Sequence, residues 1–172
     1  MFIKLFGALL LILSGTGLGI YYGMETELRR RELAELKRAL MVMHSETEFG
    51  HTHLAPMCRR AAGSCERGIS DIFISFAEGL KRRNTEDIWE LWQSCLNSAQ
   101  GVHLADEDKE AIGALGKSLG ADDINLQLSG IRLAVSYIDS KDEELAQLSS
   151  KNLRLYKSGG ALIGIFAVIL LF

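Results

Sequence analysis

Two long uncharged runs near the ends of this 172-residue chain constrain its fold more than any other feature. The first covers residues 5–24 and the second covers residues 158–172, and both are mostly apolar. Twenty helical residues span about 30 Å, which matches the hydrocarbon core of a bilayer. The second run spans only about 22 Å, so it needs a locally thinned bilayer or a helix that extends upstream past Lys157, whose side chain can snorkel. We therefore predict transmembrane helices at residues 1–24 and 158–172.

A cleaved signal peptide is the alternative for the N-terminus. Lys4 precedes the apolar stretch, and small residues follow at positions 14–17, as in a secretory leader. However, the apolar run continues to Tyr22, beyond the usual length of such a leader. The basic residues that follow it also resist export, so a membrane-spanning helix is the favoured interpretation.

Basic residues on the inner side of both runs predict the orientation. Arg29, Arg30 and Arg31 follow the first run closely, where they can also meet anionic lipid headgroups, and Lys157 is the last basic residue before the second. Cytoplasmic flanks of membrane helices carry an excess of Lys and Arg. We therefore expect residues 25–157 to form a cytoplasmic domain, with both termini on the other side of the membrane.

Glycines recur every fourth residue in both apolar runs. They are Gly15, Gly19 and Gly23 in the first run and Gly160 and Gly164 in the second. Small residues at this spacing let two helix backbones approach closely in lipid, although glycine is also generally common in membrane helices. The pattern leaves open whether the partner helix belongs to the same chain or to a second copy in a homo-oligomer.

The middle of the chain predicts an all-α fold. Apolar residues recur there at three- and four-residue spacing, no strand pattern is found, and the chain has only one proline, Pro56. The expected domain is a bundle of about six helices between the two transmembrane helices. We predict these helices at residues 25–45, 56–65, 69–80, 86–96, 106–119 and 124–157, with Asn84 or Thr85 as the N-cap of the fourth. The last has apolar residues at heptad spacing and should continue into the membrane as a rod of about fifty residues; its apolar face fits the bundle core or an intermolecular coiled coil.

No catalytic, cofactor-binding or metal-binding motif is found. His44, His51 and His53 lie near Glu46 and Glu48, but their spacing matches no zinc motif, and a solvated helix end explains them better. The chain also lacks a phosphate-binding GxxxxGK[ST] loop. A net charge of −3 gives no electrostatic footprint for nucleic acid. We therefore expect neither an enzyme nor a nucleic-acid-binding protein.

The three cysteines are too few for a disulfide scaffold. In a cytoplasmic domain they would be free thiols. Cys58 and Cys65 are seven residues apart, so they could share a helix face, but Gly63 lies between them. We expect them to be small buried apolar side chains rather than metal ligands.

Three stretches of the sequence together resemble one known family. They are KLFGALLLILSGTGLG at residues 4–19, ALMVMHSETEFGHTHL at residues 39–54 and LGADDINLQLSGIRL at residues 119–133. The first is similar to the opening membrane helix of the stage III sporulation protein AB family, and the other two are similar to its signatures. The matching signature residues are Glu46, Gly50, Thr52, Leu54, Gly120, Asp123 and Gln127.

The resemblance implies a structural role in the membrane. Members of this family belong to the mother-cell side of a channel that joins mother cell and forespore during engulfment. Their soluble region is similar to the six-helix cytoplasmic domain of the type II secretion platform protein. By this analogy the chain would lie in the mother-cell (outer forespore) membrane and contact other channel proteins and a cytoplasmic secretion-type ATPase.

Two expectations about the bundle follow from turn chemistry and geometry. The segments 50–54 and 120–127 would define the fold, with Asp123 as the N-cap of the last helix. The ATPase would bind at the end of the bundle away from the membrane. The alternative function is a membrane-anchored helical scaffold or signalling adaptor outside any secretion apparatus.

Overall fold

The computed structural model describes residues 2–50, 52–82 and 87–171, and it describes side chains within residues 24–50, 52–82 and 87–148. Within these ranges the chain forms seven helices and no strand, which confirms the all-α prediction. The helices are α1 (Phe2–Phe49), α2 (Leu54–Ala62), α3 (Arg67–Arg82), α4 (Ile88–Ser98), α5 (Asp106–Gly113), α6 (Leu115–Leu119) and α7 (Ile124–Leu171).

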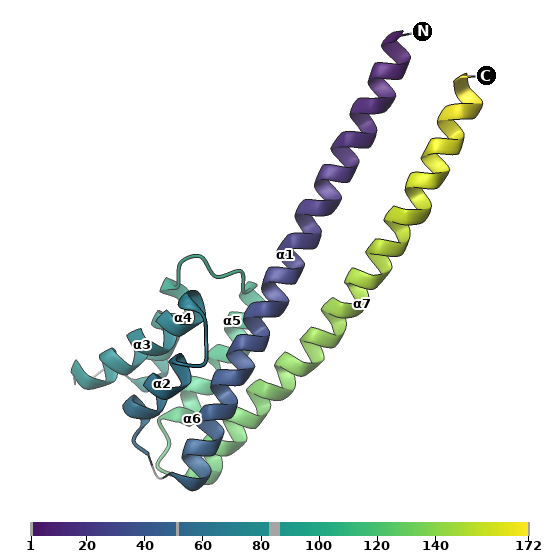
Figure 1. Ribbon diagram of the computed structural model, residues 1–172. Coiled ribbons are helices and arrows are strands. Elements are labelled where there is room, and N and C mark those ends of the chain that lie inside the picture. Colours follow the sequence, from purple (N-terminus) through teal and green to yellow (C-terminus); the bar gives the residue numbers. More distant parts are fainter. Residues whose placement is uncertain (1, 51, 83–86, 172) are drawn as a thin grey trace. The chain divides into compact units, whose positions relative to one another are not determined.

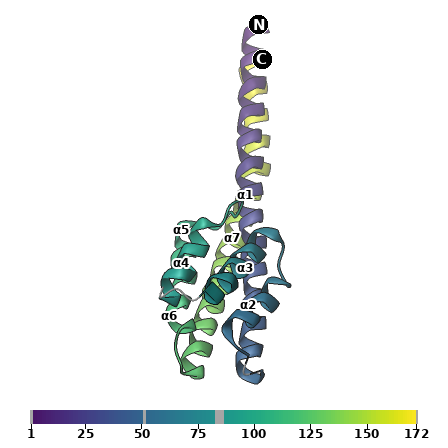
Figure 2. The same cartoon turned by 90° about the vertical axis from the view of Figure 1, so that its left-hand side faces the viewer.

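The helices between the two chain ends form one compact unit, Arg29–Asp142, which we call the bundle unit. Within it the later part of α1 and the first part of α7 run antiparallel, and α2–α6 pack together beside them (Figures 1 and 2). The polar contacts between α1 and α7 include Arg30 to Asp142 at 2.8 Å, Lys37 to Asp139 at 2.5 Å and Arg132 to His44 at 3.2 Å. The remaining parts of α1 and α7 belong to a second unit.

The first and last helices are each 48 residues long. The length of α7 confirms the predicted rod of about fifty residues. At the other end, the two predicted helices at residues 1–24 and 25–45 are one continuous helix, because no proline interrupts residues 2–49.

The described side chains run from Met24 to Leu148. Apart from Met24 itself, the side chains of the two predicted membrane spans lie outside this part of the chain. Within the described part of the chain, no helix contains a stretch that is both long and apolar enough to cross a membrane. Transmembrane helices at residues 1–24 and 158–172 therefore stay predictions. The same holds for Lys157 and for the five glycines of the packing pattern, whose surroundings also lie outside the described side chains.

Two apolar clusters form the core of the bundle unit. On α1 the predicted face of Leu33, Leu36, Leu40 and Met43 is fully buried. The second cluster centres on Trp92 of α4, whose ring lies 5.5 Å from that of Phe73 and 5.0 Å from that of Phe76. The indole Nε1 donates a hydrogen bond of 3.0 Å to the carbonyl of Ile112, so this large buried side chain has its polar atom satisfied.

The predicted helix at residues 106–119 is interrupted at Ala114, which separates α5 from α6. Both short helices pack against α4. A Cβ atom on Gly116 would lie 2.9 Å from Cδ1 of Trp92, and one on Gly113 would lie 2.6 Å from Nε2 of Gln93. Close packing of α4 against the two glycines thus accompanies a break that apolar spacing alone could not predict.

The start of α4 also differs from the prediction. Asn84 and Thr85 lie outside the described residues. The N-cap of α4 is Asp87, whose carboxylate accepts a 3.1 Å hydrogen bond from the backbone N–H of Trp89. An aspartate in this position satisfies one of the free N–H groups of the first turn.

The apolar face of α7 is mainly bundle core within the bundle unit. Ile131 and Ile138 are buried there, as the core interpretation predicted, and Ala134 between them is buried as well. Ile124 is instead 41 % exposed, because it is the first residue of the helix. Within the bundle unit, the apolar residues of this heptad pattern therefore pack against other helices of the same chain.

Cys58 and Cys95 are buried and Cys65 is half-buried, and none of the three forms a disulfide bond. Burial, and to a smaller extent the neighbouring Cys95, raises the pKa of Cys58 to about 12. Burial also raises the pKa of Cys65. These thiols are therefore almost fully protonated, and so weakly nucleophilic, at neutral pH.

We expect a disulfide reagent at pH 8 to modify the folded full-length protein at Cys65 first. Modification of Cys58 and Cys95 should wait for unfolding, because reagent access requires the core to open. Absorbance of the released thiolate over time, with and without denaturant, measures this order. Rapid modification of all three thiols in the folded protein would contradict the burial described here.

Candidate interaction site at the loop end

Residues 46–50, 52–54 and 120–127 form one end of the bundle unit, which we call the loop end. The stretch of α1 from Arg29 to Phe49 places it about 30 Å from the end where Arg29 and Asp142 lie. The last turn of α1, the connection to α2 and the start of α7 meet here (Figures 1 and 2). This end contains all seven family signature residues predicted from the sequence.

Glu46 organises the connection between α1 and α2. Its Oε2 atom accepts hydrogen bonds from the hydroxyl of Thr52, at 2.7 Å, and from the guanidinium of Arg60. These two hydrogen bonds, that of Arg60 first, lower the pKa of Glu46 below its usual range. A Cβ atom on Gly50 would lie 2.8 Å from Oγ1 of Thr52 and 2.9 Å from the carbonyl oxygen of Glu46, so this turn needs glycine for close approach.

The start of α7 is fixed by side-chain bonds to backbone groups. Asp123 Oδ1 accepts a 2.8 Å hydrogen bond from the N–H of Asn125, and its carbonyl accepts from the N–H groups of Leu126 and Gln127. The Gln127 amide donates to the carbonyl of Ala121 at 2.6 Å, which holds the preceding turn against the helix. Asp123 therefore has the contacts of an N-cap residue.

Replacing Asp123 with alanine is expected to lower the free energy of unfolding by about 1 kcal/mol, the usual cost of a lost N-cap. Asp123→Ser keeps an oxygen acceptor and should retain most of the stability. Urea unfolding of the full-length protein in detergent, followed by tryptophan fluorescence, measures both. Equal stability of Asp123→Ala and the wild type would show that the hydrogen bond to Asn125 contributes nothing.

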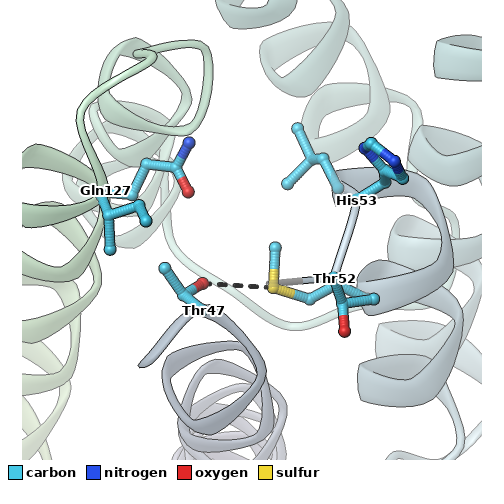
Figure 3. A pocket seen from close by; sticks show the side chains of 7 residues that line it. Thr47, Thr52, His53 and Gln127 are labelled. Atoms are coloured by element: carbon cyan, nitrogen blue, oxygen red, sulfur yellow. Dashed lines mark hydrogen bonds between the residues drawn. The ribbon is translucent and has the colours of Figure 1, made fainter. Parts of the chain in front are cut away.

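A pocket of about 240 Å³ lies between the two segments of the loop end (Figure 3). Its lining comes from the end of α1, the start of α2 and the first turn of α7: Thr47, Thr52, His53, Leu54, Met57, Ile124 and Gln127. The buried Thr47 hydroxyl donates to the carbonyl of Met43 at 2.9 Å and lies 3.3 Å from the sulfur of Met57. The pocket thus has apolar walls with a few polar groups, which suits one apolar side chain with a polar neighbour.

The structure brings most of the predicted signature residues to this pocket, but not all of them. Thr52, Leu54 and Gln127 line it, and Glu46 and Gly50 shape its edge through Thr52. Gly120 instead faces α4, where an added Cβ atom would lie 3.3 Å from that of Ile88. Thr47 and Met57 were not predicted, because each occurs in the sequence only as part of an ordinary helix pattern.

The loop end itself contains exposed apolar side chains and several carboxylates. Phe49 is 79 % exposed and Leu126 is 53 % exposed. Residues 46–54 and 120–127 contain four carboxylates, those of Glu46, Glu48, Asp122 and Asp123, and no Lys or Arg. Among the described side chains no group of three or more His, Cys, Asp or Glu is placed to hold a metal ion. The chemistry of this end therefore fits contact with another macromolecule.

The three arginines expected to set the membrane orientation have partners within the bundle unit. Arg29 bonds to Glu107 and Asp108, Arg30 bonds to Asp142, and Arg31 bonds to Glu66. From the sequence we expected this cluster to meet anionic lipid headgroups, and these ion pairs were not predicted. A run of three basic residues in the sequence does not predict which distant carboxylates will form ion pairs with it in the folded chain.

Comparison with known proteins agrees with the sequence resemblance. The family described as Stage III sporulation protein AB matches residues 4–172. Stage III sporulation protein AB of Bacillus subtilis (strain 168) is 25 % identical over 170 residues, which cover 98 % of this chain and 99 % of that protein. A solved structure of stage III sporulation protein AB shares the fold, with a TM-score of 0.65 and 22 % identity over 72 % of this chain and 97 % of that chain. The chain therefore belongs to the stage III sporulation protein AB family.

Proposed function

We propose that this protein is a structural subunit of a membrane platform in the channel between mother cell and forespore, and that a cytoplasmic secretion-type ATPase docks at its loop end. Membership of a sporulation family over nearly the whole chain supports the first part. The proposed location is the mother-cell membrane around the forespore, with the bundle unit in the cytoplasm. The role is mechanical and needs no catalytic group or cofactor.

The observation that carries the docking site is the pocket at the loop end, whose lining includes Ile124, a large apolar side chain that is 41 % exposed. Exposed large apolar side chains that frame a pocket are typical of interaction surfaces. The exposed carboxylates of Glu48, Asp122 and Asp123 favour a partner segment with an apolar side chain flanked by Lys or Arg, because opposite charges steer association. If both apolar runs cross the membrane in the predicted orientation, the bundle unit lies in the cytoplasm, where such an ATPase would be.

Site-specific photo-cross-linking in sporulating cells tests this proposal. A photoreactive amino acid at Phe49 is expected to cross-link the ATPase, whereas one at exposed Ser140, near the opposite end of the bundle unit, is not. Cross-links to the ATPase from position 140 alone would overturn the assignment of the loop end. Cross-links from neither position, with the protein present in the membrane, would favour an adaptor outside any secretion apparatus.

The predicted glycine packing has its own test. Replacing Gly15, Gly19 and Gly23 with leucine should remove partner membrane proteins from material co-purified from sporulating cells, because bulky side chains prevent close helix contact. The loop-end cross-link should survive this change. Unchanged co-purification would show that the glycines reflect only the general composition of membrane helices.

A further inference from the structure

A second pocket, of about 270 Å³, lies between α5, α6 and the first part of α7, and we call it the α7 groove. Alanine and leucine side chains supply most of its lining, and Lys117 is the one charged residue among them. Its floor is the contact between α6 and α7, where a Cβ atom on Gly130 would collide with Oγ of Ser118. The groove is separate from the loop-end pocket, which lies between α1, α2 and α7.

Two leucines of α7 line this groove and are largely exposed to solvent. Leu126 is 53 % exposed and Leu133 is 71 % exposed. They are seven residues apart, so they lie on one face of the helix, two turns or about 10 Å from each other. The bundle core uses a different face of α7, that of Ile131 and Ile138. The exposed leucines therefore form a second apolar face beside an apolar groove, which is typical of a site that binds a helix.

The two ends of the α7 groove carry opposite charges. Since α6 ends and α7 begins at the loop end, Lys117 and Leu126 lie at that end of the groove. Glu110 is one turn before Ala114, which lines the groove, and so lies toward the other end. Both charged side chains are exposed, and neither forms an ion pair with another described side chain. Nζ of Lys117 instead lies 5.3 Å from the ring centroid of Trp89.

We propose that the α7 groove binds an amphipathic helix of a partner protein, which lies antiparallel to α7. Apolar side chains at positions i, i+4 and i+7 of this helix fill the groove between Leu126 and Leu133, because that spacing forms one helix face. The N-terminal end of a helix carries partial positive charge and the C-terminal end partial negative charge. The first turn of the partner helix therefore lies beside Glu110 and its last turn beside Lys117. Basic residues in the first turn and acidic residues in the last add ion pairs.

This site is independent of the ATPase docking proposed for the loop end, and its charges disfavour a second copy of this chain as the occupant. In the predicted orientation two copies cross one membrane in the same direction, so their α7 helices run parallel. A two-fold axis along these helices places each residue at the level of its own copy. Lys117 would then face Lys117, and Glu110 would face Glu110, which opposes association. A partner helix with the complementary order of charges has no such conflict.

Two synthetic helical peptides of about 14 residues, or four turns, test the site. Both have leucines at i, i+4 and i+7; the matched peptide has lysines in its first turn and glutamates in its last, and the reversed peptide has the opposite order. Fluorescence anisotropy of the labelled peptides measures binding to the full-length protein in lipid nanodiscs, with empty nanodiscs as the blank. The matched peptide should bind about fivefold more tightly, since exposed ion pairs at two ends distinguish the peptides. The reversed peptide is the more stable isolated helix, so helix stability cannot produce this preference.

Three variants assign the binding to the groove. Glu110→Lys/Lys117→Glu should invert the preference between the two peptides, because it exchanges the charges at the two ends. Leu133→Ser should weaken binding of both peptides about tenfold, since a leucine is no longer buried on binding. Phe49→Ser is the matched control and should leave both affinities unchanged, because Phe49 is equally apolar and exposed but lies outside the groove.

Equal affinity for the two peptides, no binding of either, or an unchanged preference in the charge-exchanged variant would overturn the proposal. Equal weakening by Phe49→Ser and Leu133→Ser would also contradict it. In sporulating cells, a photoreactive amino acid at position 133 should cross-link a segment of another protein that has the matched order of charges. Cross-links only to a second copy of this chain would assign the groove to self-association instead.

Discussion

Replacing Arg29 with methionine is expected to lower the free energy of unfolding by about 3–5 kcal/mol, because it leaves the fully buried Asp108 without its charged partner. The hydrogen bonds from Tyr137 and Ala105 remain, but they carry no opposite charge. Asp108→Asn should cost less, since the Arg29 side chain is 17 % exposed and can recover some contact with water. Urea unfolding of the full-length protein in detergent, followed by tryptophan fluorescence, measures both.

Lys37→Met is the matched control for this prediction. Lys37 lies on the same helix and pairs with Asp139 of α7, but the two side chains are 40 % and 50 % exposed. Exposed ion pairs contribute at most about 1 kcal/mol, so this variant should unfold nearly as the wild type does. Similar losses for Arg29→Met and Lys37→Met would mean that burial of Asp108 does not set the cost.

Replacing Trp92 with alanine is expected to lower the free energy of unfolding by about 3–5 kcal/mol. The side chain is fully buried against Phe73 and Phe76, and its loss leaves a cavity between α3 and α4. The carbonyl of Ile112 also loses its hydrogen bond from the indole. Circular dichroism during thermal unfolding is the suitable measurement, because the substitution removes a fluorophore.

Trp92→Phe separates the two causes. It keeps an aromatic ring beside Phe73 and Phe76 but removes the indole N–H, so it should lose less stability than Trp92→Ala. Substitution of the neighbouring Trp89, which is only half-buried, should also cost less. A loss below about 1 kcal/mol for Trp92→Ala would contradict the placement of this side chain at the centre of the core.

Local patterns determined which segments are helical, because apolar spacing and caps act over a few residues. The buried face of Leu33, Leu36, Leu40 and Met43 was predicted correctly. The contacts of Asp123 at the start of α7 agree with the cap expected from the sequence. The break at Ala114 was not predictable in this way, since it accompanies close packing of α4 against Gly113 and Gly116.

The candidate site was predicted only in part. The family signatures indicated the two segments of the loop end. They did not indicate which residues form a pocket there, because sequence similarity marks residues without giving their contacts. The folded chain is needed to bring Thr47 and Met57 beside Gln127 and so to form a pocket.

Neighbouring residues are enough to establish that the chain is helical and that apolar runs lie at both ends, since these properties are local. The roles of Arg29 and Asp108 emerge only when the helices pack. The two residues are 79 positions apart; from the sequence, Arg29 was predicted only to set the membrane orientation, and Asp108 only to belong to the helix at residues 106–119. A buried charge pair depends on which helices meet, and the packing of α1 against α5 and α7 brings these two side chains together away from water.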